Sequence, residues 1–212
     1  MTKKKEKVLK KIMEMWMPTL RTAGAPIALQ LQDDAAAKPL QKEHFTVQQG
    51  AVMHHSALVM DPREFVFATC FLSDGAVIRS DMARVTIGAY VLVDSGALIR
   101  PPLRFAKKKV EALKVAVGSY CHFGCHCVCE ALSVGNFVLI EERAIIGKMS
   151  VLSVGCWVRA DCVVPPSSVL IPFGVYSGNP ARLVATTTED VHPLYVRERI
   201  LEILQQRCAP LL

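Results

Sequence analysis

The chain is poor in aromatic residues, which make up 7% of its 212 residues, although hydrophobic residues as a whole make up 51%. Its core must therefore be built mainly from Val, Ile, Leu, Ala and Cys, which suits an architecture with a narrow and repetitive interior. No stretch reaches the roughly 18 to 20 uncharged apolar residues that a spanning helix needs, so we expect no stable membrane insertion. The first residues also lack the apolar segment of a secretory signal, and we expect an intracellular protein.

The net charge of +6 is distributed unevenly. Residues 1–14 hold six Lys and two Glu (+4), and residues 104–114 hold five Lys or Arg and one Glu (+4), so the remainder sums to 6 − 8 = −2. Such local basicity indicates two patches, and it argues against nucleic acid as a partner. The chain has eight cysteines, which without a secretory signal are expected to be reduced thiols.

A six-residue repeat organises the second half of the chain. Bulky apolar residues recur at every sixth position, and the position two before each is mostly small. This period fits neither a helix nor a long alternating strand. It predicts an all-β solenoid, a left-handed parallel β-helix of hexapeptide repeats, in which one bulky side chain from each face fills a triangular prism. The bulky series is Val134, Ile140, Ile146, Leu152, Val158, Val164, Leu170 and Tyr176, and the small series is Leu132, Val138, Ala144, Ser150, Cys156, Cys162, Ser168 and Gly174.

The repeat divides the chain into three parts. Residues 1–45 form a basic N-terminal extension and linker, in which residues 1–17 have the pattern of an amphipathic helix. Residues 46–183 form the β-helix, with an excursion at 101–116. Residues 184–212 form a C-terminal helical segment, whose spacing predicts a helix from about Asp190 to Gln206 against the coil. The extension has three candidate roles: a partner helix, a contact with a membrane surface, or a targeting presequence.

The segment CHFGCHCVCE at 121–130 has a density of cysteine and histidine that is typical of zinc sites. In the hexapeptide register, however, Cys121 and Cys127 occupy the small inward position, and Cys129 occupies the bulky one. Buried free cysteine is a small hydrophobic residue, so we interpret these thiols as core filler.

Three residues of the same segment, His122, Cys125 and His126, are expected to face outward or to lie at corners. They fall on different parts of two successive hexads, whereas zinc needs four convergent ligands. We predict no metal and no other cofactor here.

Two longer segments carry a resemblance to a known family. The segment IRSDMARVTIGAYVLVDSGALIRPP (78–102) is similar to one shared by γ-class carbonic-anhydrase-like proteins and the dynactin pointed-end subunits, with Arg79, Asp81 and Gly88 at the shared places. The segment VLSVGCWVRADCVVPPSSVLIPFGVYSGNPARL (151–183) resembles dynactin subunit 5 in particular. The resemblance extends over about residues 50–183.

The resemblance also allows a comparison with the carbonic anhydrases, which bind their metal with three histidines. The matching positions here are Ile99, Cys125 and Glu130. Without a metal-bound hydroxide there is no nucleophile for carbon dioxide hydration, so no catalytic residue is expected. Arg79, Asp81 and Asp94 are interpreted as structural remnants of the γ-class motif that pair at coil corners. Acyltransferases of this fold are similar in placing a catalytic histidine near an excursion, and residues 101–116 contain none.

By resemblance, the expected protein is not an enzyme. It is a structural subunit of the dynactin pointed-end complex, associated with the cytoskeleton in the cytoplasm. It would pair with a second β-helical subunit, with actin-related protein nearby, and support recognition of dynein adaptors or cargo. The alternative from another class is a divergent γ-class homotrimer that binds metal through substituted ligands such as Cys125 and Glu130.

The excursion at 101–116 has two open interpretations. Its basic residues Arg104, Lys107, Lys108 and Lys109 either form a solvated loop or dock an acidic partner surface.

Overall fold

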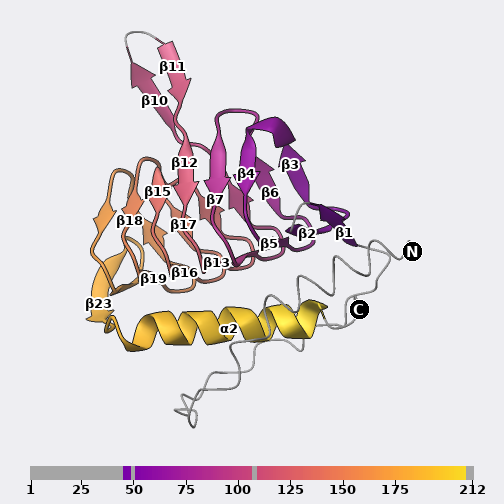
Figure 1. Ribbon diagram of the computed structural model, residues 1–212. Coiled ribbons are helices and arrows are strands. Elements are labelled where there is room, and N and C mark those ends of the chain that lie inside the picture. The colour runs from indigo at the N-terminus through magenta and orange to yellow at the C-terminus, as the bar shows by residue number, and fades with distance from the viewer. Residues whose placement is uncertain (1–44, 49–50, 107–108, 209–212) are drawn as a thin grey trace.

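The computed structural model describes residues 45–48, 51–106 and 109–208. Short strands wind into a three-sided prism, and a single helix within these residues lies along one of its faces (Figure 1). The predicted β-solenoid with a C-terminal helix is confirmed. Residues 1–44 of the predicted N-terminal extension lie outside the described residues, and Phe45, the last residue assigned to the extension, begins the first described strand.

The three faces of the prism are three β-sheets, which we call sheets A, B and C. Sheet A has nine strands, and sheets B and C have six each. Sheet A runs β1 (Phe45–Gln48), β2 (Ala51–His54), β5 (Cys70–Leu72), β8 (Val91–Val93), β13 (His122–Phe123), β16 (Leu139–Ile140), β19 (Trp157–Val158), β22 (Gly174–Ser177) and β23 (Arg182–Thr186). Sheet B runs β3 (Leu58–Met60), β6 (Val77–Arg79), β9 (Leu98–Ile99), β14 (Val128–Cys129), β17 (Ile145–Ile146) and β20 (Val163–Val164). Sheet C runs β4 (Phe65–Phe67), β7 (Val85–Ile87), β12 (Val115–Val117), β15 (Ser133–Val134), β18 (Val151–Leu152) and β21 (Val169–Leu170), and a 3-10 turn (Pro62–Glu64) precedes β4.

The core fills the prism as the hexapeptide register predicts. Each of the two-residue strands from β16 to β21 turns one aliphatic side chain inward, and these residues, from Ile140 to Leu170, are at most 2% exposed. The thiols of Cys121, Cys127 and Cys129 are 0 to 1% exposed, so the prediction that they are buried is confirmed. Burial raises the pKa of Cys121 and Cys129 to about 12, which keeps both as neutral thiols.

One residue of the predicted register is wrong. Leu132 was assigned to the small inward position, but Ala131 is the fully buried residue there and Leu132 is only partly buried. The step from Cys129 to Val134 is five residues instead of six, so this corner is one residue shorter. Because the corner is shorter, the inward position falls on Ala131 instead of Leu132.

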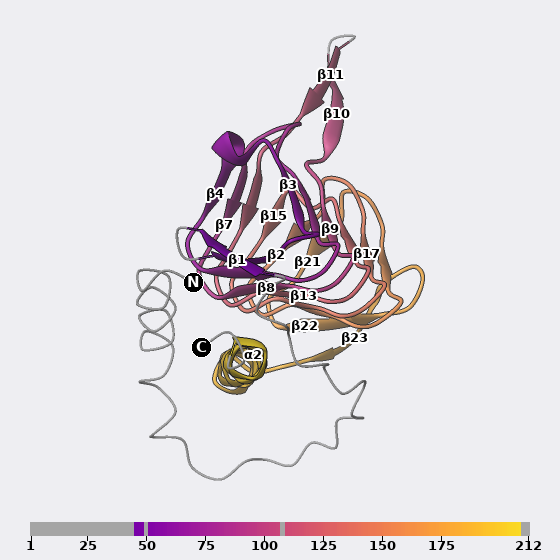
Figure 2. The same ribbon diagram turned by 90° about the vertical axis from the view of Figure 1, so that its right-hand side faces the viewer.

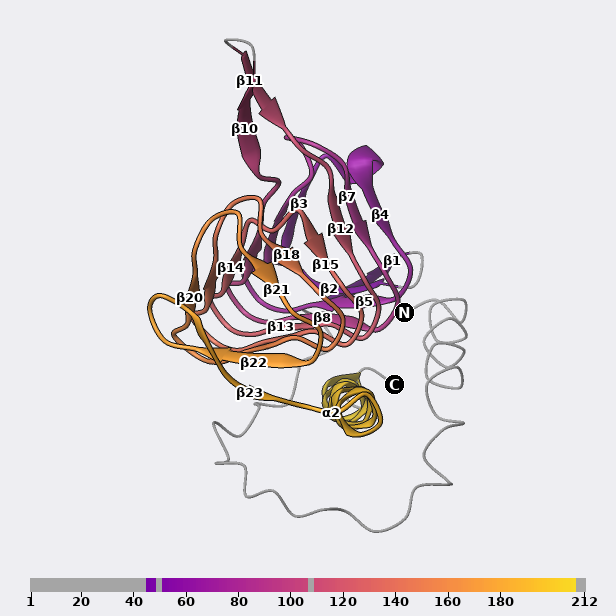
Figure 3. The same ribbon diagram turned by 90° about the vertical axis from the view of Figure 1, so that its left-hand side faces the viewer.

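Helix α2 (Val191–Cys208) covers the outer surface of sheet A and runs along the prism axis (Figures 2 and 3). Val196, Ile200 and Leu204, spaced four residues apart, are at most 1% exposed and pack against Phe71 and Leu92. This spacing places them on one helix face, so the helix makes a second core with the sheet. None of the helices in the described ranges could span a membrane.

The chain leaves the prism once within the described ranges, as a hairpin of β10 (Leu103–Ala106) and β11 (Lys109–Ala112). The hairpin projects from the edge where sheets B and C meet (Figures 1 and 2). The excursion expected at 101–116 therefore contains an ordered pair of antiparallel strands, and the chain has rejoined sheet C at Val115.

Candidate functional surfaces

Arg79 and Asp81, the first two residues of the γ-class motif, pair with each other after strand β6. The guanidinium Nε and Nη2 donate to Oδ1 and Oδ2 of the carboxylate at 2.8 and 2.9 Å. This hydrogen bond, with the arginine charge, lowers the pKa of Asp81. Both carboxylate oxygens are thus engaged by one guanidinium group.

Asp94 lies apart from that pair, in a polar cluster beneath helix α2. Its carboxylate is 6% exposed and accepts a hydrogen bond from His122 Nε2 at 2.7 Å. Arg207 of helix α2 donates to its other oxygen and, at 2.9 Å, to the hydroxyl of Ser73. Asp94 directly follows strand β8, and its partners come from a neighbouring strand and from the helix.

Opposing effects act on the pKa of Asp94. Burial would raise it, but the charges and hydrogen bonds of His122 and Arg207 outweigh burial and lower it to about 2. The carboxylate is an ionised group that joins helix α2 to sheet A. Its oxygens face protein donors, so it is not placed to act as a general base.

His122 and its neighbours do not converge on a metal position. His122 points out of the prism as expected, but helix α2 covers it and leaves it 8% exposed. Cys125 is partly buried, and His126 is exposed at a corner with φ of 56°. Within residues 45–48, 51–106 and 109–208, no group of three or more His, Cys, Asp or Glu side chains is placed to hold a metal ion.

The three residues at the positions of the carbonic anhydrase ligands are not available to bind a metal. Ile99 points into the prism and is fully buried. Glu130 forms an ion pair with Arg100. Burial raises the pKa of the Cys125 thiol, which disfavours the thiolate that a metal would need.

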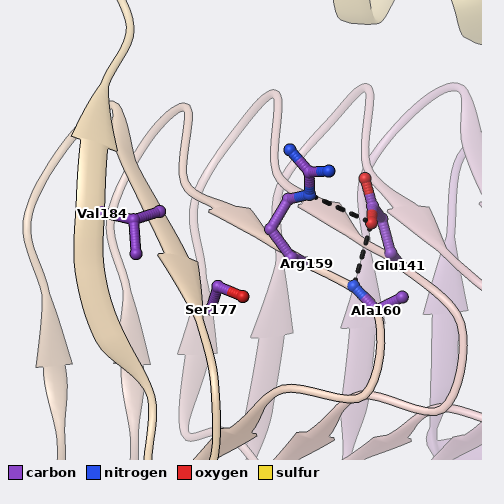
Figure 4. Close-up of a pocket in the computed structure, with 5 residues that line it drawn as sticks. All are labelled: Glu141, Arg159, Ala160, Ser177 and Val184. Atoms are coloured by element: carbon purple, nitrogen blue, oxygen red, sulfur yellow. Dashed lines mark hydrogen bonds and ion pairs between the residues drawn. The ribbon is translucent and has the colours of Figure 1, made fainter. Parts of the chain in front are cut away.

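A shallow hollow on the surface is lined by Glu141, Arg159, Ala160, Ser177 and Val184 (Figure 4). Glu141 accepts hydrogen bonds from Trp157 Nε1 at 2.7 Å and from the Ala160 N–H at 2.9 Å, and Arg159 lies 3.5 Å from the same carboxylate. The carboxylate of Glu141 is held by two hydrogen-bond donors and one ion pair from the next coil, so it is not free to act as an acid or base.

The residues of the candidate docking loop are distributed over the hairpin. Arg104 of β10 and Glu111 of β11 are opposite each other and form an ion pair at 3.3 Å. Lys109 is exposed in β11, and Lys107 and Lys108 lie outside the described residues. Sequence reasoning missed the apolar residues of this hairpin: Phe105 is 84% exposed, Val110 54% and Leu103 37%. Their alternation along LRFA and KVEA is the signal that could have revealed them.

The outer surfaces of the three sheets differ in composition. In each sheet, the side chains that point away from the prism line up from strand to strand, and we call this set the outward column. The outward column of sheet A is covered by helix α2. In sheet C, the outward positions of the three consecutive strands β7, β12 and β15 hold the small or polar residues Thr86, Ala116 and Ser133. The column of sheet B is aliphatic in all six strands, with Leu58, Val77, Leu98, Val128, Ile145 and Val163 in register.

Residues 42–204 match the family model for dynactin subunit 5, which accounts for most of the chain. The chain belongs to the dynactin subunit 5 family. This membership makes it a dynactin subunit and connects it with dynein-based transport. The resemblance to dynactin subunit 5 that the sequence indicated is therefore confirmed.

Solved structures that are similar to this dynactin subunit are distant from it in sequence. A hexapeptide transferase family protein from Anaplasma phagocytophilum is 14% identical and has a TM-score of 0.54, with 71% of this chain and 89% of that chain covered. The N-acyltransferase AntD from Bacillus cereus is 12% identical with a TM-score of 0.45, covering 75% and 90%. A maltose O-acetyltransferase from Clostridium difficile is 16% identical with a TM-score of 0.39, covering 88% of each. The first of these shows the left-handed hexapeptide fold and does not bear on activity.

Proposed function

We propose that this dynactin subunit is a non-catalytic structural part of the pointed-end complex. It pairs with a second β-helical subunit, lies near actin-related protein, and supports recognition of dynein adaptors or cargo in the cytoplasm. The absence of catalysis is supported by the state of the candidate groups: Asp81, Asp94, Glu130 and Glu141 are each held by donors of the chain itself.

The observation that carries the pairing is a difference between the two ends of sheet B. At the C-terminal end, the Val163 N–H donates to the Gly178 carbonyl, and the Ala181 N–H donates to the Val163 carbonyl, so the chain covers β20 itself. At the N-terminal end, β3 is the last strand of the sheet in the described part of the chain. An uncovered edge strand is a template for pairing with another chain.

The geometry of β3 indicates which backbone groups a partner would use. The Leu58 N–H donates inward to the Ala76 carbonyl at 2.8 Å. Because successive residues of a parallel strand alternate between its two neighbours, the N–H of Val59 faces the outer edge. A second β-helix stacked on this end would continue sheet B by one strand.

A proline at position 59 tests this proposal, since it removes that N–H and is tolerated at a sheet edge. Native affinity purification of the tagged chain is expected to recover a second hexapeptide-repeat protein with the parent chain and with Val59→Ala. Recovery should fall sharply with Val59→Pro. Thermal unfolding of each variant alone checks that the fold is retained. Recovery of only a self-trimer with stoichiometric zinc would contradict the proposal and favour the γ-class alternative.

A further inference from the structure

The β10–β11 hairpin has two chemically different faces. Residues directly opposite in an antiparallel pair share a face, and faces alternate along each strand. The register pairs Phe105 with Val110 and Leu103 with Ala112, which places these four on one face. Arg104 pairs with Glu111 on the other face. The hairpin is therefore amphipathic.

The apolar face has no cover from the described chain. Phe105 and Val110 are 84% and 54% exposed, and neither belongs to the core of the prism or to the core under helix α2. The base, in contrast, is anchored, because Pro101 and Pro102 are buried and the Leu113 N–H donates to the Pro102 carbonyl at 3.0 Å. The hairpin thus leaves the prism at a fixed point and projects outward (Figure 3). It carries Phe105, which is exposed.

A two-stranded hairpin is only marginally stable when its apolar face is in water. An exposed aromatic side chain beside a β-branched one is a common anchor in protein interfaces. These properties indicate a surface that is completed by a partner.

The charge around the hairpin restricts the chemistry of that partner. Residues 104–114 carry a net charge of +4 in the sequence. Arg104 is paired with Glu111, so the remaining basic charge attracts acidic groups. A partner would place apolar side chains on Phe105 and Val110 and acidic side chains toward Lys109.

An anionic membrane would also attract basic and aromatic residues, but the arrangement favours a protein. Lys109 is exposed in the outermost described pair of the hairpin, opposite Ala106, and Phe105 and Val110 lie one pair nearer the base. Insertion of Phe105 into lipid from this end would require Lys109 to pass the headgroups first, which is costly for a charged side chain.

We infer that the apolar face of the β10–β11 hairpin, formed by Leu103, Phe105 and Val110, docks an acidic amphipathic segment of a protein partner of the complex. This inference rests on the proposed function, because it names the surface through which the subunit contacts an adaptor or cargo protein. It assigns the main contact to the apolar residues, and the basic residues discriminate between partners.

Site-specific photo-crosslinking in the assembled complex tests the inference. The photoreactive residue p-benzoylphenylalanine is placed at Phe105 on the apolar face or, as the matched control, at Glu111 on the charged face. After irradiation of the native complex, we expect position 105 to crosslink to a peptide of another protein that is acidic and has apolar residues at helical spacing. The yield at position 111 should be at least ten-fold lower. Crosslinks only to lipid, only to the chain itself, or equally from both positions would overturn the inference.

A second variant separates this inference from the pairing of β-helices. Phe105→Ser should reduce recovery of the crosslinked partner at least ten-fold and leave recovery of the second hexapeptide-repeat protein unchanged. If the parent chain recovers no second β-helix, the proposed pairing fails, and the crosslinks at position 105 still decide the inference. If Phe105→Ser retains the crosslinked partner fully, the hairpin is not its docking surface.

Discussion

Sheets A and B are built by the same repeat, yet their outer surfaces differ. In sheet A the outward column includes Phe71, Leu92 and Leu139, which are at most 3% exposed because helix α2 lies on them. In sheet B the corresponding column is also aliphatic, but Ile145 is 44% exposed and Leu58 49%. The comparison shows that the same hexapeptide repeat builds the interior behind both sheets, while the exposure of the outer side chains depends on what covers each face.

The largest expected difference between the two sheets is in stability. Leu139 and Ile145 are outward residues of consecutive hexads, one under the helix and one uncovered. Leu139→Ala should lower the free energy of unfolding by about 2–5 kcal/mol, because a buried cavity is created. Ile145→Ala should lower it by less than about 1.5 kcal/mol, since much of that side chain is already in water. Urea denaturation of both variants checks this, and equal losses would mean that the helix contributes little to the covered face.

The polar cluster under the helix provides the next prediction. Asp94→Asn removes the charge that Arg207 and His122 face, and should cost about 1–3 kcal/mol at neutral pH. Asp81→Asn, which affects a partly exposed pair, is the control and should change stability much less.

The same cluster predicts a pH dependence. The pKa of Asp94 is about 2 in the folded chain and about 3.9 in an unfolded one. A lowered pKa contributes stability that is complete above pH 4 and is lost as the pH falls toward 2. The difference in urea midpoint between the parent chain and Asp94→Asn should therefore shrink between pH 5 and pH 3. A difference that stays constant would show that Asp94 acts by shape alone.

Rates of thiol alkylation compare a residue at a corner of the prism with residues in its interior. Cys125 is partly buried at a corner, whereas Cys121, Cys127 and Cys129 are at most 1% exposed. Alkylation of the native protein, followed by peptide mapping, should modify Cys125 at least ten-fold faster than the other three. Addition of zinc should not slow the reaction, because no metal ligand set includes this thiol in the described residues. Protection of Cys125 by zinc would contradict the prediction that the segment 121–130 binds no metal.

The smallest effect is expected on sheet C. Val169 is 71% exposed at the outer surface of β21, so Val169→Thr should change the free energy of unfolding by no more than about 0.5 kcal/mol. Val163→Thr in β20 of sheet B, which is partly buried, should cost more. Thermal unfolding distinguishes the two, and a larger loss at position 169 would indicate that sheet C is also covered.

The interior of the prism could be predicted from the sequence because the repeat is local. A six-residue spacing assigns inward positions without knowledge of distant contacts, and it fails only where the spacing changes, at Ala131 and Leu132. The cluster of Asp94 and Arg207 could not be predicted in this way. Its two residues are 113 positions apart, and their contact depends on where helix α2 lies.

The surfaces were predicted less well for a related reason. The charges of residues 101–116 are visible in the sequence, but charge alone does not distinguish a loop from a hairpin. The structure shows that Arg104 is engaged by Glu111 and that Phe105 is the exposed residue. Only the pairing register reveals which side chains share a face.

The position of helix α2 also limits how this family can vary in length. Its N-terminal end meets Phe137 through the His192 ring, which donates to the Phe137 carbonyl at 3.0 Å, and its C-terminal end meets Asp94 through Arg207. Each added coil lengthens a β-helix by about 4.8 Å. An α-helix rises 1.5 Å per residue, so one coil inserted between these two attachments requires about three more helical residues. Relatives that gain or lose a coil there should therefore show a compensating insertion or deletion in the helix, which is far from Asp94 in the sequence.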